Sequence, residues 1–105
     1  ATNNVSFFVK HDNKYIGLAN CFTSVATFSV GRCMNIHDVI LLQEYRGKGI
    51  ANQLFNHIMD YAKHHNIVKI TLEVRSDNTI AQGLYRKYGF APSAPEMLFW
   101  SKHFS

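Results

Sequence analysis

The sequence of 105 residues has little of what marks several common protein classes. It contains two cysteines, Cys21 and Cys33, which fit neither a CxxC zinc pair nor a disulfide framework, so we expect two free, buried thiols. No apolar run approaches the roughly 20 residues that span a bilayer, and no basic segment followed by a long apolar one opens the chain. These absences exclude a disulfide-stapled scaffold, predict no membrane partner and favour a cytoplasmic location.

Acidic residues are also scarce. Seven Asp and Glu stand against eleven Lys and Arg, which gives a formal net charge of +4 and a pI near 9.2. This balance favours an anionic partner, although charge alone does not separate nucleic acid from a phosphorylated small molecule. Apolar residues make up 47% of the chain and aromatic residues 13%, which excludes a disordered chain. The length and composition predict one domain, residues 1–105, with a real core.

The first part of the sequence predicts a β-hairpin and then a buried strand. The segments Val5 to Lys10 and Lys14 to Thr27 are rich in β-branched and aromatic residues, and His11-Asp12-Asn13 between them supplies turn chemistry. Gly17 is expected to mark a bulge in the second strand. A third strand is predicted from Asn35 to Leu42.

The second part alternates helices with strands. Apolar residues recur at every fourth position from Ile50 to Ala62, which predicts a helix from Gly47 to about His65 packed on a sheet. A strand from Ile67 to Val74, a helix from about Thr79 to Tyr88 and a last strand from Met97 to Phe104 are predicted to follow. The order β-β-β-α-β-α-β predicts an α/β fold with a mixed sheet and covering helices.

The most informative stretch is the basic turn between the third strand and the first helix, Arg46-Gly47-Lys48-Gly49-Ile50-Ala51. Its two glycines lack the Cβ atoms that would hold a phosphate away from the backbone, so unpaired N–H groups and the positive end of the helix dipole can face an anion. Arg46 and Lys48 add full charges. The chain has no GxxxxGK[ST] pattern, and the turn lacks the third glycine of a Rossmann motif. It therefore predicts an anion site of another kind.

A second cluster lies one predicted strand further along the chain and has the pattern Asn78-x-x-Ala81-x-x-Leu84-Tyr85-x-Lys87-x-Gly89-Phe90. The first motif, Arg46-x-x-Gly49-x-Ala51, is similar to the [QR]-x-x-G-x-[GA] signature of the GNAT superfamily of N-acetyltransferases. The second resembles the other signature of that family, and the two occur in the family's order. Together they cover roughly Ile36 to Phe90 of this chain.

The resemblance implies acetyl-CoA as the cosubstrate. It places the pyrophosphate on Arg46, Gly47, Lys48, Gly49, Ile50 and Ala51, and the pantetheine arm and acetyl oxygen on free backbone groups around Ile40, Leu41 and Leu42. Asn78 is expected to contact the pantetheine or to cap the helix that follows it. Tyr85 is the candidate acid for the departing thiolate, because a phenol pKa near 10 is close to a thiol pKa near 8.5. The alternative for Tyr85 is ring packing with a hydrogen bond to the sulfur.

Two residues are candidates for the base that accepts a proton from the amine. Glu73 is predicted on a strand, and Leu72-Glu73-Val74-Arg75 resembles the segment that carries the base in ribosomal-protein N-terminal acetyltransferases. His37 resembles a histidine used by arylalkylamine acetyltransferases, and strand alternation predicts that Asp38 points to the opposite face. We rank Glu73 ahead of His37. The alternatives are an ion pair of Glu73 with Arg75 or Lys69 and a structural role for His37. No metal is predicted.

The sequence differs from the usual pattern of the family at its N-terminal end. Family members usually begin with a strand and two helices that help to form the acceptor pocket, whereas this sequence begins at the predicted hairpin; removal, natural loss and replacement by another chain all remain open. The leading prediction is direct acetyl transfer to a primary amine of a small molecule or peptide, and the alternative is a noncatalytic acyl-CoA-binding module. A nucleic-acid binder ranks third, because basic and aromatic residues do not interleave on a strand. A homodimer is predicted through the open sheet edge.

Overall fold

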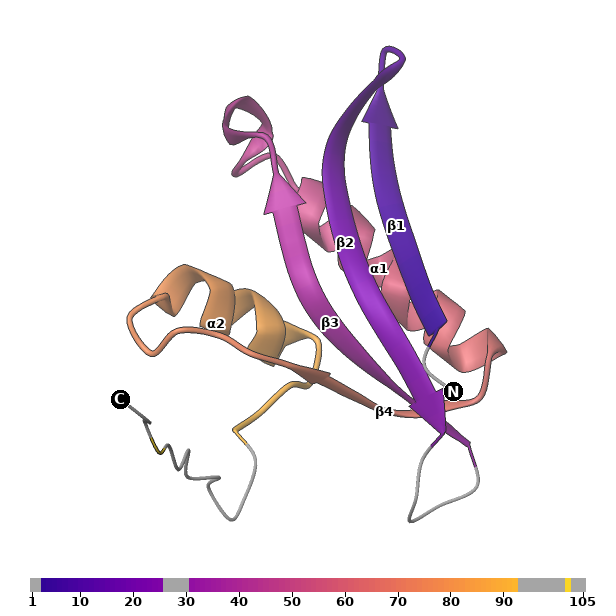
Figure 1. Ribbon diagram of the computed structural model, residues 1–105. Helices are drawn as coiled ribbons and strands as arrows, with labels where there is room; N and C mark the ends of the chain where they lie inside the picture. The colour runs from indigo at the N-terminus through magenta and orange to yellow at the C-terminus, as the bar shows by residue number, and fades with distance from the viewer. Residues whose placement is uncertain (1–2, 26–30, 93–101, 103–105) are drawn as a thin grey trace. The chain divides into compact units, whose positions relative to one another are not determined.

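The computed structural model describes residues 3–25, 31–92 and 102 (Figure 1). The chain divides into two compact units, Ala1–Arg75 and Ser76–Ser105. The expectation of one domain stays a prediction. No helix among the described residues is long and apolar enough to cross a membrane.

The first unit is built on a four-stranded sheet in the order β1-β2-β3-β4. Strands β1 (Asn3–His11), β2 (Lys14–Val25) and β3 (Arg32–Leu41) pair antiparallel, and β4 (Ile67–Leu72) pairs parallel to β3. Asp12 and Asn13, with φ of 48° and 62°, form the two-residue turn between β1 and β2. Positive φ at both positions matches the right-handed twist of paired strands, so the predicted hairpin is confirmed.

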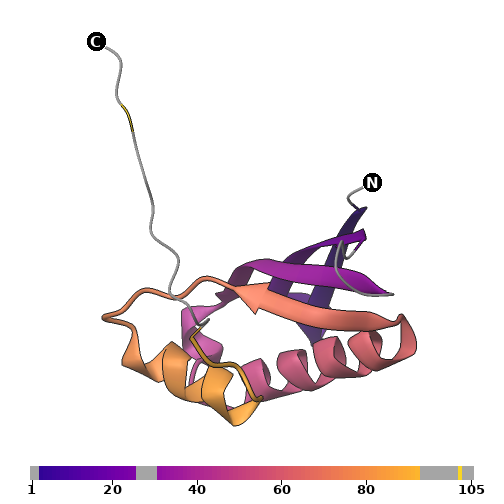
Figure 2. The ribbon, with the colours of Figure 1, turned by 90° about the horizontal axis from the view of Figure 1, so that it is seen from below.

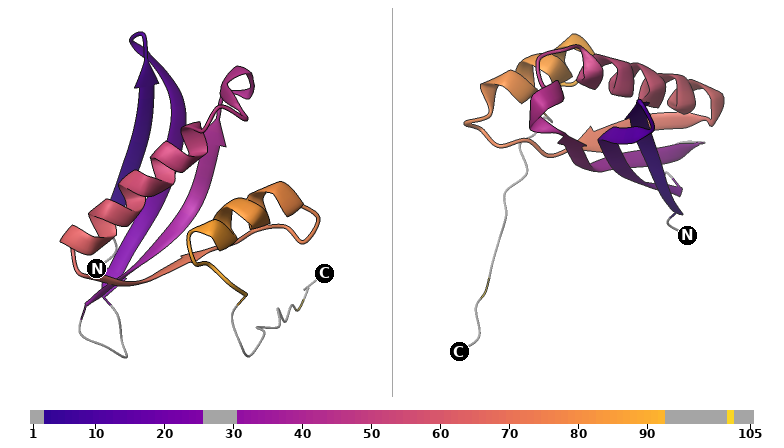
Figure 3. Two further views of the ribbon diagram at one scale, coloured as in Figure 1. Left: turned by 180° about the vertical axis from the view of Figure 1, so that it is seen from behind. Right: turned by 90° about the horizontal axis from the view of Figure 1, so that it is seen from above.

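Helix α1 (Ile50–His64) makes the crossover from β3 to β4 and covers one face of the sheet (Figures 2 and 3). Its apolar stripe buries Leu54, Phe55, Ile58 and Ala62, as the spacing of four predicts. The opposing strands supply the rest of the core of this unit: Phe7, Ile16, Ala19, Cys21, Met34 and Ile36. The other face of the sheet carries no part of α1, and we call it the open face.

The pairing register shifts at three places in the sheet, the third of them between β3 and β4, where Arg32 pairs with Ile67 and Cys33 with Lys69. Val9 pairs with Gly17 while Lys10 pairs with Tyr15, so Ile16 is an extra residue in β2, next to the predicted position Gly17. The second bulge lies between β2 and β3 and was not predicted. There the register steps from Asn20 opposite Asp38 to Cys21 opposite Ile36, which leaves His37 as the extra residue.

Several element boundaries differ from the prediction. The helix begins at Ile50 and not at Gly47, because Gly47 and Gly49 both have φ of 77°, outside the helical range. Strand β4 ends at Leu72, where its ladder with β3 stops, so Glu73 lies after the strand and not in it. Strand β3 begins at Arg32, earlier than predicted, and ends at Leu41, so Leu42 follows the strand. The last predicted strand, Met97 to Phe104, lies outside the described residues apart from residue 102.

The second unit contains helix α2 (Thr79–Lys87). The side chain of Asn78 caps it, with the Asn78 Oδ1 accepting a hydrogen bond of 3.1 Å from the Ala81 N–H. Gly89 follows the helix with φ of 90°, and its N–H donates to the Arg86 carbonyl. The helix therefore begins and ends close to the residues that its capping chemistry predicts.

Candidate functional site

The turn before α1 has the backbone geometry that an anion site needs. Gly49 is the N-cap residue, with φ of 77° and ψ of 6°, and its carbonyl accepts the first helical hydrogen bond from the Gln53 N–H at 3.2 Å. No side chain caps this end of the helix and no acidic residue lies in its first turn. The N–H groups of Ile50 and Ala51 therefore lack intrahelical acceptors at the positive end of the helix dipole.

Space is open around both glycines. A Cβ built on Gly47 or on Gly49 meets no atom within 4 Å apart from those of its chain neighbours, so no other described residue packs against either glycine at that point. Both φ values lie in the left-handed region that glycine adopts without steric cost. The two glycines thus allow a ligand to approach the backbone of the turn closely, and they adopt a backbone conformation that other residues adopt only under strain.

The turn carries two cationic side chains, those of Arg46 and Lys48, and each contacts a neighbouring element. Arg46 Nε donates to the Leu41 carbonyl at 3.3 Å, which links the turn to the end of β3. This hydrogen bond uses one N–H of the guanidinium group and does not use the others. Lys48 Nζ lies 5.7 Å from the centre of the Tyr45 ring in the 3-10 turn η1 (Gln43–Tyr45). Both side chains are exposed, so their charge is available to an anion at the helix start.

Strands β3 and β4 part after Ile36 and Leu72, and the rest of β3 leads toward this turn. Their parallel ladder runs from Arg32 opposite Ile67 to Ile36 opposite Leu72, and β3 then continues to Leu41 without β4, still paired with β2 (Figure 1). Asn35 Nδ2 donates to the Thr71 Oγ1 at 3.0 Å, next to the last pair of the ladder. Beyond that pair, one edge of β3 has no strand partner among the described residues.

The antiparallel pairing with β2 decides which backbone groups of β3 face this free edge. The Leu42 N–H donates to the Ile16 carbonyl at 3.0 Å, and the Leu42 carbonyl accepts from the Tyr45 N–H at 2.9 Å. The prediction that the backbone of Leu42 is free is therefore wrong. Because hydrogen bonding alternates along an antiparallel ladder, the Ile40 backbone also faces β2, and the backbone groups of Val39 and Leu41 face the free edge. Val39 was not predicted, since only the register distinguishes it from Ile40.

Both candidate bases leave the ladder at the same level. His37 and Glu73 follow Ile36 and Leu72, the last pair of the parallel ladder, and both are exposed. The His37 ring packs edge-on against Phe22 at 5.6 Å between centroids. The ion pairs His11–Asp12 and Lys14–Glu44 do not involve Glu73, and a pair of Glu73 with Lys69 or Arg75 stays the alternative.

The His37 bulge corrects the expectation for Asp38. Asp38 pairs with Asn20, and the ring contact of His37 is with Phe22, two residues along the same strand and so on the same face as Asn20. The extra residue offsets the alternation by one position, and both His37 and Asp38 lie exposed on the open face. The prediction that they point to opposite faces is wrong.

The second unit carries the other two predicted residues. Asn78 caps α2, which is one of the two roles expected of it. Tyr85 lies on α2 with its ring 6.2 Å from that of Phe90, and the Tyr85 carbonyl accepts from the N–H groups of Tyr88 and Phe90. Partial burial raises the pKa of the Tyr85 phenol above its ordinary value. The phenol therefore keeps its proton throughout the neutral range.

Comparison with known proteins decides the family. The family model described as "Acetyltransferase (GNAT) family" matches residues 1–90. The chain belongs to the GNAT acetyltransferase family. Among GNAT relatives, N-alpha-acetyltransferase 30 of Schizosaccharomyces pombe is 32% identical over 85 residues, which are 81% of this chain and 56% of that protein. N-alpha-acetyltransferase RimI of Mycobacterium tuberculosis is 31% identical over 85 residues, covering 74% of this chain and 52% of that protein. The chain thus spans about half the length of these two relatives.

Solved GNAT structures share the fold. The aminoglycoside N-acetyltransferase AAC(6')-Iy, determined in complex with CoA, superposes with a TM-score of 0.76 at 19% identity, covering 96% of this chain and 77% of that one. A probable acetyltransferase superposes with a TM-score of 0.84 at 20% identity, over 97% of this chain and 69% of that one. At such identities the likeness concerns the fold, which agrees with the predicted GNAT-like mixed sheet and covering helices.

Proposed function

We propose that this chain is an acetyl-CoA-dependent N-acetyltransferase domain that transfers acetyl directly to a primary amine of a small molecule or peptide. The observation that carries the proposal is the glycine turn at the start of α1, together with the edge of β3 that β4 leaves free between Ile36 and the end of the strand at Leu41. An anion site and a free strand edge, a few residues apart, suit a ligand with a pyrophosphate at one end and an amide-bearing arm at the other.

The donor side is proposed from the geometry of the first unit. The N–H groups of Ile50 and Ala51, with Arg46 and Lys48, would bind the pyrophosphate, and Gly47 and Gly49 would allow its close approach. The backbone groups of Val39 and the Leu41 N–H would bond the amides of the pantetheine arm and the acetyl oxygen, since the Leu41 carbonyl already accepts from Arg46 Nε. Ile40 and Leu42 would then contribute side-chain packing, since their backbone groups face β2 or η1.

The chemistry requires the acceptor nitrogen to attack the thioester carbonyl carbon while the carbon–sulfur bond breaks. The amine must lose a proton, and the proposed base is Glu73 or His37, acting directly or through water. Both residues directly follow the last pair of the β3–β4 ladder. The sulfur leaves as a thiolate and takes a proton, which we assign to the Tyr85 phenol from the family resemblance. Asn78 keeps its capping role, and a contact with the pantetheine stays a prediction.

The decisive experiment measures CoA binding and acetyl transfer separately. Calorimetry with CoA tests the donor site, and release of free thiol in the presence of acetyl-CoA and a panel of amines tests turnover. Binding with turnover on at least one amine supports the proposal. Binding without turnover on any acceptor would favour a noncatalytic acyl-CoA-binding module, and absence of binding would refute both.

We also propose a homodimer through the outer edge of β1. This strand lies at one end of the sheet order, so its outer backbone groups have no strand partner among the described residues. Light scattering at working concentrations tests the mass, and a monomer would count against the proposal. The cytoplasmic location stays a prediction, which fractionation of cells expressing the native gene would test.

A further inference from the structure

The end of the β1–β2 hairpin contacts η1, the short helix that leads into the glycine turn. Lys14 Nζ, at the start of β2, lies 3.3 Å from Glu44 Oε1. The ring of His11, at the end of β1, packs edge-on against the Tyr45 ring at 5.9 Å between centroids. Two side-chain pairs therefore join the turn segment to a hairpin that is about thirty residues away in sequence.

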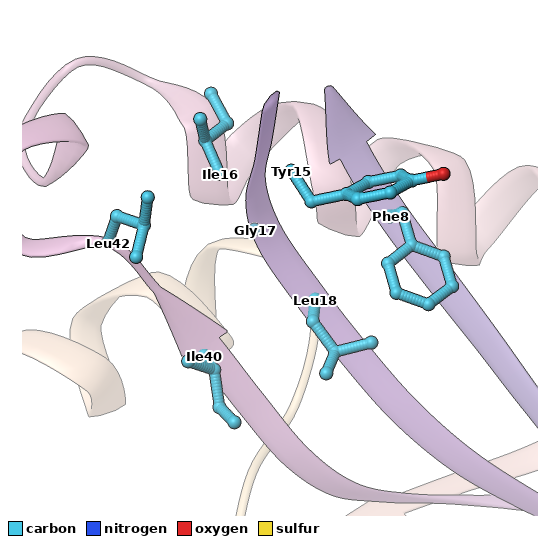
Figure 4. Close-up of a pocket in the computed structure, with 7 residues that line it drawn as sticks. All are labelled: Phe8, Tyr15, Ile16, Gly17, Leu18, Ile40 and Leu42. Atoms are coloured by element: carbon cyan, nitrogen blue, oxygen red, sulfur yellow. The ribbon is translucent and has the colours of Figure 1, made fainter. Parts of the chain in front are cut away.

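Backbone hydrogen bonds attach η1 to the sheet as well. The Leu42 N–H donates to the Ile16 carbonyl, and Figure 4 shows Leu42 where the chain leaves β3, with Ile16 on the neighbouring strand. The Leu42 carbonyl in turn accepts from the Tyr45 N–H at 2.9 Å. Within residues 43–49, Tyr45 is half-buried and every other residue is exposed. The Tyr45 ring thus has a defined place, set by both its backbone and its contact with the hairpin.

The Tyr45 ring also contacts one of the two cations of the turn. Lys48 Nζ lies 5.7 Å from the ring centre, within the roughly 6 Å over which an aromatic face attracts a cation. Glu44 lies four residues before Lys48, but its carboxylate pairs with Lys14 of the hairpin. A free lysine side chain loses much conformational freedom when it binds a ligand, so a contact that restricts it beforehand lowers the entropy cost of binding.

We propose that Tyr45 is a positioning residue of the donor site, whose ring holds the Lys48 ammonium group in place for the pyrophosphate of CoA. This inference rests on the proposed binding of acetyl-CoA and assigns Tyr45 a role that acts through Lys48. The face of the ring attracts the cation, so the phenol OH is not required. The hairpin supports the same contact from a distance, because His11 packs against the ring.

A double-mutant cycle on Tyr45 and Lys48 tests the inference, with the Kd for CoA measured by calorimetry. Lys48→Ala should raise the Kd about tenfold or more, as for loss of a charged hydrogen bond. Tyr45→Leu should raise it about two- to fivefold, the range of an exposed cation–π contact. In the Lys48→Ala background, Tyr45→Leu should leave the Kd within about 1.5-fold, because the cation that the ring positions is then gone.

Two further variants separate the aromatic face from other effects. Tyr45→Phe keeps the face and should keep the wild-type Kd. Tyr15→Leu is the matched control, since Lys10 Nζ lies 5.4 Å from the centre of the Tyr15 ring, which points away from Leu42 (Figure 4). It removes a ring from a similar pair in the same unit and should leave the Kd for CoA unchanged. Urea unfolding checks that each variant is folded.

Dephospho-CoA identifies the phosphate group that Lys48 binds. This probe lacks the 3′-phosphate of CoA and keeps the pyrophosphate. Lys48→Ala and Tyr45→Leu should therefore weaken dephospho-CoA by the same factors as CoA. Effects confined to CoA would overturn the inference, because Lys48 would then bind the 3′-phosphate.

The cycle also distinguishes the inference from its alternatives. An equal loss from Tyr45→Leu with and without Lys48 would overturn it, because the ring would then act on the shape of the turn. Tighter binding of CoA by Tyr45→Leu would overturn it too, because the ring would then compete with the phosphate for Lys48. The cycle measures binding alone, so it remains decisive in a chain that binds CoA without acetyl transfer. Additive losses refute this inference alone, whereas absence of CoA binding by wild type refutes the proposed donor site as well.

Discussion

Replacing Gly49 by alanine tests the anion-binding turn with little disturbance elsewhere. Gly49 adopts φ of 77° and ψ of 6°, a left-handed conformation that costs an L-residue roughly 1–2 kcal/mol. The added Cβ meets no atom within 4 Å, so no packing clash adds to this cost. Alanine reduces the freedom of the unfolded chain, which offsets about 0.4–1 kcal/mol. We therefore expect G49A to lower the free energy of unfolding by about 1 kcal/mol.

The effect on CoA should be larger than this modest loss of stability implies. The methyl group occupies space next to the turn that a phosphate needs in order to accept hydrogen bonds of about 2.9 Å from the first N–H groups of α1. We expect the Kd for CoA, measured by calorimetry on the folded variant, to rise at least about tenfold, or about 1.4 kcal/mol. Urea unfolding of the same preparation separately measures the change in the free energy of unfolding.

Gly83→Ala is the matched control. Gly83 lies inside α2, has no positive φ and leaves open space for a Cβ, so alanine should stabilise the chain by about 0.5–1 kcal/mol and leave the Kd for CoA unchanged. If G49A kept a Kd within about threefold of wild type while losing the expected stability, the pyrophosphate would not lie against this turn and the reasoning would be refuted.

Three further predictions concern single side chains. Tyr85→Phe should reduce kcat roughly 10- to 10,000-fold with little change in CoA affinity; because burial raises the phenol pKa above 10.0, loss of activity from ionisation of Tyr85 should begin only above about pH 10. An unchanged kcat would remove the role as acid. Of Glu73→Gln and His37→Gln, the variant that removes the base should lower kcat about 100-fold and the other should change it little, so two mild effects would exclude both assignments. Burial raises the pKa of Cys21 to about 11, so roughly one thiol in a thousand is ionised at pH 8. Mass spectrometry after iodoacetamide treatment should find Cys21 unmodified in the native protein and alkylated in urea, and rapid native alkylation would contradict its burial.

Much of the first unit follows from local signals in the sequence. The pair Asp12-Asn13 adopts the positive φ values that join two strands in a hairpin, and the apolar spacing of four residues forms the buried stripe of α1. The glycines at 47 and 49 take the left-handed conformation that their lack of Cβ makes inexpensive. The capping of α2 by Asn78 is equally local, since the side chain bonds an N–H three residues ahead. Such features depend on interactions within a few residues, which a sequence pattern records directly.

The sequence by itself thus determined the family, the order of the described elements and the place of the anion-binding turn. Only the tertiary structure decided that His37 is an extra residue in β3, that Asp38 shares its face, and that Val39 and Leu41, not Leu42, present backbone groups to the free edge. It likewise decided that Glu73 follows β4, because the ladder with β3 stops at Leu72. The physical reason is the same in each case: the direction of a backbone hydrogen bond in a sheet depends on the register with a strand distant in sequence, and one inserted residue changes every assignment beyond it.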